Sequence, residues 1–244
     1  MAVFPQRVFY VAAELSGCRY EIVNKKSGAT ENYEFRRQQK PARKGAKGKS
    51  GRKARSSAIV SSSRRNFKNF LLTGRPGVGK TSVIEAVARE FGDLTGGFTT
   101  GEIRERGIRK GFSVAALDGT SAVLAHEDFA GPVRVGKYGV DVPAFERIAL
   151  PALRDAMSRK RIVLIDEIGK MELASPRFCD LVREALDSPL IVVATVMEKP
   201  HRFADEIKSR GDVETLEVTI GNRSALPGKI SEMIRRELES GARR

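Results

Sequence analysis

The sequence predicts an α/β protein with a mostly parallel sheet whose two faces are covered by helices. Apolar runs with the length of buried strands alternate with segments whose apolar residues recur at helical spacing. One of these strands leads through a glycine-rich loop directly into a helix, so that free N–H groups and the helix dipole converge at the loop. The 244 residues, 41% of them hydrophobic, suffice for one sizeable α/β domain with an appendage.

Residues 1–65 form a basic N-terminal extension. They hold 16 Lys/Arg and 4 Asp/Glu and so carry +12 of the net charge of +14. Strand-like runs occur at 8–13 and 20–23, with little else to bury them. Residues 36–55 contain ten basic and no acidic residues, and such a segment buries too little apolar surface to offset its ordering entropy. We therefore expect the extension to be largely disordered.

Three interpretations of this extension stay open. Residues 36–55 can bind nucleic acid through salt-sensitive phosphate contacts, although without interleaved aromatic residues we expect no sequence-specific recognition. The extension can equally be a solvated tail, or an upstream addition produced by an early start codon.

From residue 66 onward the chain reads as a single domain, to residue 244. A strand at 67–73 and a helix at 80–91 flank the glycine-rich loop. A β-meander follows at 97–125, because strand-like runs surround a charged turn at Gly107 and Asp118-Gly119 marks a second turn.

The second half of this domain continues the alternation. Asp141 can cap a helix that reaches residue 159, although Pro151 should kink or interrupt it. Ser175-Pro176 is a helix start signal, with Ser as the cap and Pro in the first turn. The remaining predicted elements are strands at 161–165, 189–196 and 213–219 and a final helix at 226–238.

The loop after the first strand of this domain has the sequence GRPGVGKT, a complete G-x-x-x-x-G-K-[ST] phosphate-binding motif. Its glycines allow tight turns that aim successive amide N–H groups at a triphosphate. Lys80 can reach the β- and γ-phosphate oxygens, and the Thr81 hydroxyl can ligate Mg²⁺. We expect the whole loop to bind nucleotide: Gly74, Arg75, Pro76, Gly77, Val78, Gly79, Lys80 and Thr81.

An acidic pair supplies the second half of the predicted site. Residues 162–165 are apolar and lead into Asp166, at the carboxyl end of a predicted central strand, where α/β sheets present ligands. Asp166 suits Mg²⁺, directly or through water, and Glu167 can orient or deprotonate the attacking water. The same segment fits the D-x-x-G pattern of GTPases, but no N-K-x-D motif follows it, so guanine specificity is not expected.

Other site residues are less constrained by pattern. Thr195 is either a polar sensor of the γ-phosphate or simply a good strand former. Further positive charge near the phosphates can come from one of four candidates, Lys170, Arg104, Lys137 or Arg223. The two cysteines are too few and too far apart for a disulfide framework, the two histidines lack metal-ligand spacing, and no apolar run is long enough to span a bilayer. We expect a soluble, cytoplasmic protein.

Together these segments resemble the small P-loop nucleoside-triphosphatases of the thermophile-type family, which includes the cancer-related nucleoside-triphosphatase. The resemblance covers about residues 66–234. Two of the segments that carry it, DEIGKME at 166–172 and VGKYGVD at 135–141, are highly specific. The others are GRPGVGKT at 74–81, GGFTTGEIRERGIRKGF at 96–112 and VTIGNRSAL at 218–226. Thr99 is a departure, because members often have an aromatic residue there.

The resemblance implies a three-layer P-loop sandwich and slow, base-tolerant hydrolysis of ATP, GTP and other nucleoside triphosphates to diphosphates. It also implies that Asn222-Arg223 touches the nucleobase or ribose. A further set of residues is implied to line the nucleotide site: Leu164, Ile165, Asp166, Glu167, Ile168, Gly169, Lys170 and Met171.

The sequence thus predicts a Mg²⁺-dependent triphosphatase with Lys80 and Glu167 in catalytic roles and Thr81 and Asp166 at the metal. Two alternatives remain: a nucleotide or small-molecule kinase, and a nucleic-acid-associated ATPase recruited through the basic extension.

Overall fold

The structure, a computed structural model, describes residues 19–23, 30–34 and 67–241. In the first two of these ranges, β1 (Arg19–Val23) and β2 (Thr30–Glu34) pair in antiparallel fashion, which confirms the strand predicted at 20–23. The strand predicted at 8–13 and the disorder predicted at 36–55 lie outside the described residues.

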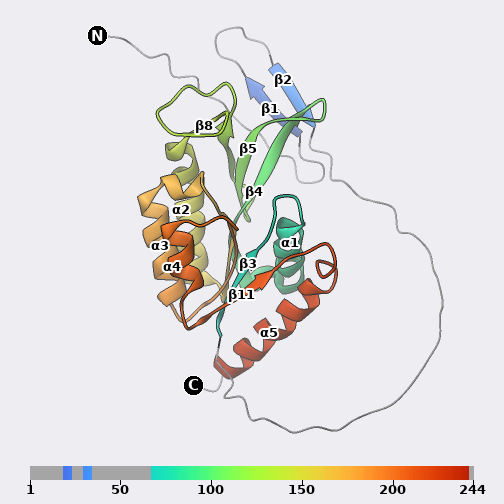
Figure 1. Cartoon of the computed structure of the whole chain (residues 1–244), viewed down its shortest axis with the longest axis vertical. Coiled ribbons are helices and arrows are strands. Elements are labelled where there is room, and N and C mark those ends of the chain that lie inside the picture. Colours follow the sequence, from blue (N-terminus) through green and yellow to red (C-terminus); the bar gives the residue numbers. More distant parts are fainter. Residues whose placement is uncertain (1–18, 24–29, 35–66, 242–244) are drawn as a thin grey trace, which may run out of the picture.

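A nine-stranded mixed sheet forms the middle layer of the domain (Figure 1). Its parallel half contains, in order, β11 (Val213–Glu217), β3 (Asn69–Thr73), β10 (Ile191–Val196), β9 (Ile162–Ile168) and β4 (Thr95–Glu105). The antiparallel half continues from β4 through β5 (Ile108–Ala116), β6 (Ser121–His126), β8 (Tyr138–Val140) and β7 (Arg134–Val135). The parallel sheet and the meander are confirmed, whereas β7 and β8 were not predicted.

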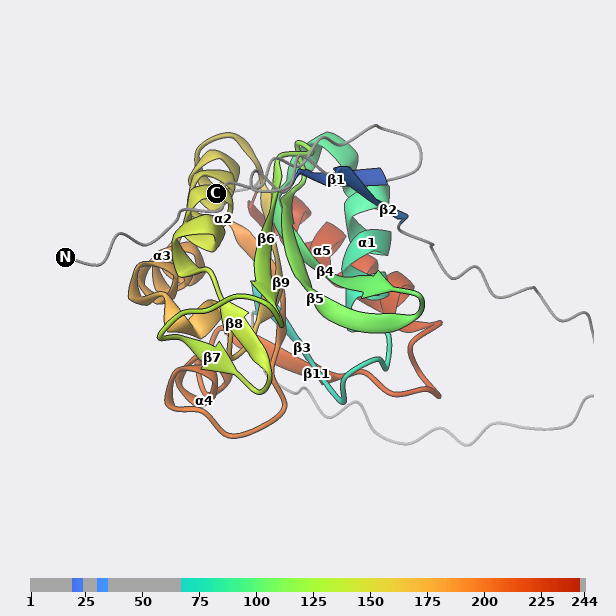
Figure 2. The same ribbon diagram turned by 90° about the horizontal axis from the view of Figure 1, so that it is seen from above.

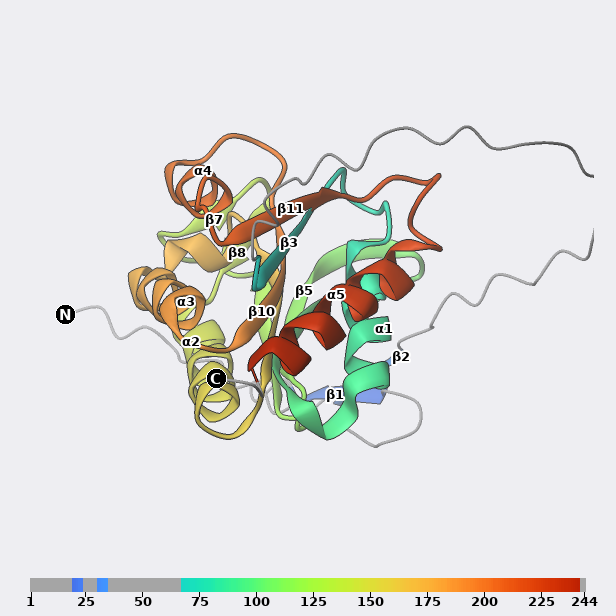
Figure 3. The same cartoon turned by 90° about the horizontal axis from the view of Figure 1, so that it is seen from below.

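Helices cover both faces of this sheet, as the views in Figures 2 and 3 show. On one face lie α1 (Lys80–Phe91) and α5 (Leu226–Gly241). On the other lie α2 (Val142–Arg159), α3 (Pro176–Asp187) and α4 (Arg202–Lys208). The three-layer arrangement is confirmed, and α4 is the helix that the sequence reading missed.

Each face of the sheet has its own hydrophobic core, because strands covered on both sides are apolar at every position. Along β9, Val163 and Ile165 face the core under α2 and α3, while Ile162 and Leu164 face the core under α1 and α5. The first core contains an edge-to-face aromatic trio with ring centroids 5.1–5.8 Å apart, formed by Phe98, Phe145 and Phe178.

Two predicted helix starts are confirmed by their caps. Asp141 accepts a hydrogen bond from the Ala144 N–H at 2.9 Å, and Ser175 accepts one from the Phe178 N–H at 3.0 Å. The predicted interruption at Pro151 is wrong, because α2 is a single helix of 18 residues. Pro151 is exposed, and the helix persists because its opposite side is packed in the core through Phe145, Ile148, Ala149 and Leu153.

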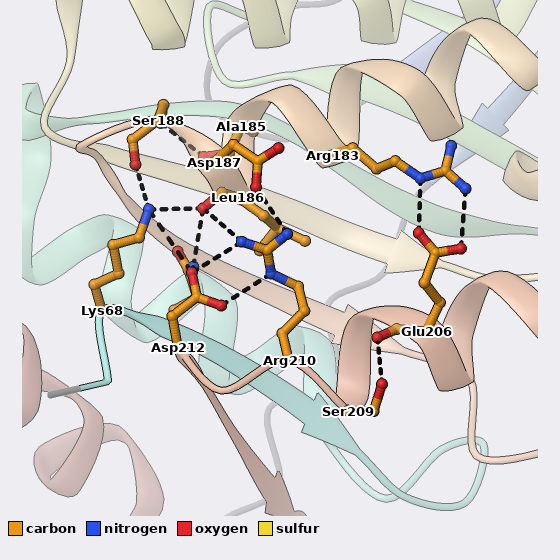
Figure 4. Close-up of polar contacts among 11 residues, drawn as sticks. Lys68, Arg183, Ala185, Leu186, Asp187, Ser188, Glu206, Ser209, Arg210 and Asp212 are labelled. Carbon is orange, nitrogen blue, oxygen red and sulfur yellow. Dashed lines mark hydrogen bonds and ion pairs between the residues drawn. The ribbon is translucent and has the colours of Figure 1, made fainter. Parts of the chain in front are cut away.

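A polar network closes the end of α3 (Figure 4). The Lys68 ammonium donates to the carbonyls of Leu186, at 2.6 Å, and Ser188. Arg210 pairs with Asp212 at 2.9 Å and with Asp187 at 2.8 Å. These cations satisfy carbonyls that a helix leaves without partners at its C-terminus and complement its dipole. Lys68 directly precedes β3, and Asp212 directly precedes β11. The network therefore lies at the amino-terminal ends of these strands, whereas the phosphate-binding loop follows the carboxyl end of β3.

Candidate active site

The phosphate-binding loop joins the carboxyl end of β3 to the first turn of α1 (Figure 1). Gly79 occupies the N-cap position with a φ of 111°, and no side chain caps the helix. At Gly74, with a φ of 140°, a Cβ would lie 2.6 Å from the Val218 carbonyl oxygen, so only glycine fits. The uncapped N–H groups of α1 are therefore free to bind an anion.

Lys80 is the first residue of α1 and directly follows the last glycine of this loop. Its residue exposure is only 8%, and its ammonium donates to the Gly74 carbonyl at 3.0 Å. The same ammonium lies 3.8 Å from Oε2 of Glu167, whose side chain is 36% exposed. The structure thus brings together the two residues predicted to be catalytic.

Asp166 lies beside them on β9, buried to 1% exposure. The Thr195 hydroxyl of β10 donates to its Oδ1 at 2.5 Å, while Oδ2 is buried without a hydrogen-bond partner. Burial raises the pKa of Asp166 to about 6, with the nearby Thr195 and Thr81 hydroxyls and Lys80 acting to lower it and Glu167 to raise it. The Thr195 hydroxyl thus holds one oxygen of Asp166, and its role as a sensor of the γ-phosphate stays a prediction.

The surroundings of Asp166 fit a magnesium ion. Its partnerless Oδ2 is a hard oxygen donor, and the Thr81 hydroxyl lies close enough to influence the same carboxyl. Among the described residues no three His, Cys, Asp or Glu side chains form a metal-binding group. Mg²⁺ does not need such a cage, because it is usually held by one or two protein oxygens, water and substrate phosphates.

The other residues expected at the nucleotide site differ in what they present. Arg75 and Pro76 are exposed on the loop, and Val78 packs against the core under α1. Leu164, Ile165 and Ile168 have fully buried side chains, so they contribute the strand that carries Asp166 rather than a contact surface. Lys170 is exposed and Met171 packs against the core under α2.

Of the four candidate cations, Arg223 is the one that the structure places against the phosphate-binding loop. Its guanidinium donates to the Val78 carbonyl at 3.4 Å, and its Cδ would lie 3.5 Å from a Cβ at Gly79. Arg104 is instead paired with Glu102 and the Gly107 carbonyl, and Lys137 with Glu127.

Asn222 and Thr99 have more limited parts. The Asn222 amide is used within its own turn, where its Oδ1 accepts from the Thr219 N–H and its Nδ2 donates to the Glu217 carbonyl, both at 2.8 Å. Thr99 follows Phe98, which pairs with Ile165, so Thr99 lies level with Asp166 at the edge of the site.

Glu172 is the site residue that the sequence reading missed. It is 5% exposed and accepts a hydrogen bond from the Gly169 N–H at 3.2 Å. Burial raises its pKa to about 8, and the charges of Glu167 and Asp166 act in the same direction. Its sequence signals were its place at the end of the DEIGKME segment and one more acidic residue after Asp166-Glu167, which is as compatible with a solvated turn.

Comparisons with known proteins found a matching family model and several similar proteins. A family model described as NTPase matches residues 69–231. The nucleoside-triphosphatase THEP1 of Thermotoga sp. (strain RQ2) is 42% identical over 166 residues, which cover 68% of this chain and 95% of that protein. The human cancer-related nucleoside-triphosphatase is 41% identical over 175 residues, which cover 65% of this chain and 92% of that protein.

Two solved structures are also similar. The crystal structure of THEP1 from the hyperthermophile Aquifex aeolicus has a TM-score of 0.61 and 36% identity, covering 66% of this chain and 96% of that one. The solution structure of a human cancer-related nucleoside triphosphatase has a TM-score of 0.61 and 38% identity, covering 69% and 98%. In each of these comparisons the matched part is about two thirds of this chain.

Proposed function

The chain belongs to the NTPase family, and we propose from this premise that it hydrolyses nucleoside 5′-triphosphates to diphosphates and phosphate. The observation that carries the proposal is the contact between Lys80 and Glu167 at the mouth of the phosphate-binding loop, 3.8 Å apart. A cation that can hold the γ-phosphate and a carboxylate that can receive a proton are thereby adjacent, as in-line attack by water requires.

Each side chain has the environment that its role needs. Lys80 is nearly buried, so its charge acts on the phosphates with little screening by solvent. Glu167 is partly exposed, so a water molecule can approach it and lose a proton to it during attack on the γ-phosphorus. The bond from the γ-phosphorus to the bridging oxygen breaks, and the diphosphate leaves with that electron pair. The loop N–H groups and the N-terminus of α1 hold the charged phosphates throughout.

We propose Mg²⁺ as the cofactor, held by Asp166 and the Thr81 hydroxyl. When bound, it would neutralise charge on the β- and γ-phosphates. The partnerless Oδ2 of Asp166 supports this assignment.

Low base selectivity is part of the proposal. The Asn222 amide, which the resemblance implies touches the nucleobase or ribose, is already satisfied by Thr219 and Glu217. Reading a base with it would require that turn to open, so we expect ATP, GTP and other triphosphates to be hydrolysed at comparable rates.

Substitution of Glu167 by Gln tests the mechanism. Glu167→Gln should bind nucleotide normally, but its kcat should be lower by a factor of about 100 or more. The amide keeps the shape of the side chain but cannot accept a proton from water. Phosphate release and nucleotide affinity would be measured for the wild type and the variant. Glu198→Gln is the matched control, since Glu198 is an exposed glutamate at the same edge of the sheet.

Undiminished phosphate release from Glu167→Gln would overturn the base assignment. Product analysis separates hydrolysis from the kinase alternative, because a kinase releases little free phosphate until an acceptor is supplied.

Within the described residues, no helix has the length and apolarity needed to cross a bilayer. We propose a cytoplasmic location, in which Cys18 and Cys179 remain reduced. Nucleic acid is a proposed partner through residues 36–55, which lie outside the described residues.

A further inference from the structure

The turn after β9 buries one glutamate, Glu172, close to the end of that strand. The Leu173 N–H donates to the Gly169 carbonyl at 2.9 Å, and a 3₁₀ turn follows at Glu172–Ala174. The Ser175 N–H then donates to the Glu172 carbonyl at 3.0 Å. These bonds hold the backbone so that the Glu172 carboxyl lies under the Gly169 N–H rather than in solvent.

Gly169 separates this carboxyl from the one that the proposed mechanism uses. A Cβ added at Gly169 would lie 2.7 Å from Oε1 of Glu167 and 2.9 Å from Oε2 of Glu172. Both oxygens therefore border the same small space beside Gly169, and a methyl group in that space would have to displace one of them. The other oxygen of Glu167 lies 3.8 Å from the Lys80 ammonium. The Glu167 carboxylate is thus confined between Lys80 on α1 and the Gly169–Glu172 turn.

The charges around Glu172 suit a neutral acid in this position. Burial holds its pKa near 8, and the charged groups that act on it are Glu167 and Asp166 of β9. Among the described residues, no Lys or Arg forms an ion pair with it. A neutral carboxyl can accept the Gly169 N–H and border Glu167 without repelling it. An ionised one would place a second negative charge beside the base.

We propose that Glu172, folded beneath Gly169, is a positioning residue that fixes the Glu167 carboxylate toward the phosphate-binding loop. The inference rests on the proposed function, because it assigns to Glu172 a part in the same hydrolysis. Glu172 acts through Glu167 and makes no contact with substrate.

Two substitutions at Glu172 separate positioning from a merely structural role. Glu172→Ala should lower kcat roughly 10-fold or more and change KM by less than about 3-fold, as for other residues that orient a reactive group. Glu172→Gln keeps the shape of the neutral acid and should retain kcat within about 3-fold of the wild type at neutral pH. Both should be compared with Glu198→Gln, which should match the wild type.

The pH dependence of kcat is a readout that would not change if Glu172 had only a structural role. In the wild type, kcat should fall as pH rises through about 8, because Glu172 loses its proton and repels Glu167. Glu172→Gln has no such proton and should keep its kcat through that range. Gly169→Ala should lower kcat as Glu172→Ala does, since its methyl group displaces Glu167.

The proposal is overturned if Glu172→Gln shows the same alkaline fall as the wild type, or if folded Glu172→Ala retains full kcat. If Glu172→Ala fails to fold, the pH profile of Glu172→Gln alone decides. A wild-type protein that releases no phosphate, or a fully active Glu167→Gln, would instead refute the proposed function itself. The two failures are therefore distinguishable.

Discussion

At the scale of single residues, three carboxyl groups in one short segment have different chemistry because their surroundings differ. Asp166 is buried beside Thr195 with one oxygen available for a metal. Glu167 is partly exposed and faces Lys80, and Glu172 is buried and has no ion-pair partner among the described residues. The three side chains have nearly the same intrinsic acidity, so burial and neighbouring charge decide their proposed functions.

Arg223 offers a test at the same scale. Arg223→Ala should lower kcat roughly 10-fold, because a guanidinium at the loop can stabilise charge that develops on the phosphates. Steady-state phosphate release gives kcat and KM for each variant. Lys199→Ala removes the same charge from an exposed position after β10 and should leave kcat unchanged. If kcat falls equally in the two variants, Arg223 contributes only through the net charge of the protein and has no specific role at the phosphates.

At the scale of elements, local signals and packing compete, and packing wins in α2. Caps at Asp141 and Ser175 start α2 and α3 where the sequence places them. Pro151 should kink or interrupt α2 on local grounds, since it removes one backbone hydrogen bond and crowds the preceding turn. The buried side of the helix outweighs that cost.

Replacing Pro151 should therefore stabilise the protein. Pro151→Ala restores a helical N–H and loses no packing, because residue 151 is exposed. Greater freedom of the unfolded chain offsets part of the gain, so we expect about 2 kcal/mol of added stability. Thermal unfolding would show this as a higher Tm. Pro143→Ala is the control, because Pro143 lies in the first turn of α2, where proline is favourable. A Tm at or below that of the wild type would show that α2 has already adapted to Pro151.

At the scale of the whole molecule, charge and catalysis are separated along the chain. Residues 1–65 carry +12 and the remaining residues +2. Both hydrophobic cores and every residue of the proposed mechanism belong to the part that begins at residue 67. The proposed binding of a polyanion and the proposed hydrolysis therefore use different parts of the chain.

Deletion of residues 1–65 tests this separation. The truncated protein should retain kcat within about 2-fold, because its catalytic groups and cores are intact. In a filter-binding titration, full-length protein should bind RNA or DNA with an affinity that falls steeply with salt, and the truncated protein should not. Loss of turnover on truncation would contradict the domain boundary. Turnover that nucleic acid stimulates only in the full-length protein would favour the nucleic-acid-associated ATPase.

The sequence by itself determined those features whose causes are local. The spacing of glycines in residues 74–81 predicts a phosphate-binding loop, and the structure has a loop with this spacing between β3 and α1. Apolar runs predicted β9 and its neighbour β10, because strands buried on both faces are nearly continuous in apolar residues. The sequence also predicted that Asp166 and Glu167 lie at the carboxyl end of a buried strand, because they directly follow such an apolar run.

Only the tertiary structure decided features that depend on distant parts of the chain. It selected Arg223 among four equivalent cations, since the loop before α5 returns to the phosphate-binding loop. The packing of the fold keeps α2 continuous through Pro151. It also buries Glu172, a polar residue that the sequence alone would place at the surface. Burial and proximity are sums over many contacts between distant segments, and no local pattern of residues contains them.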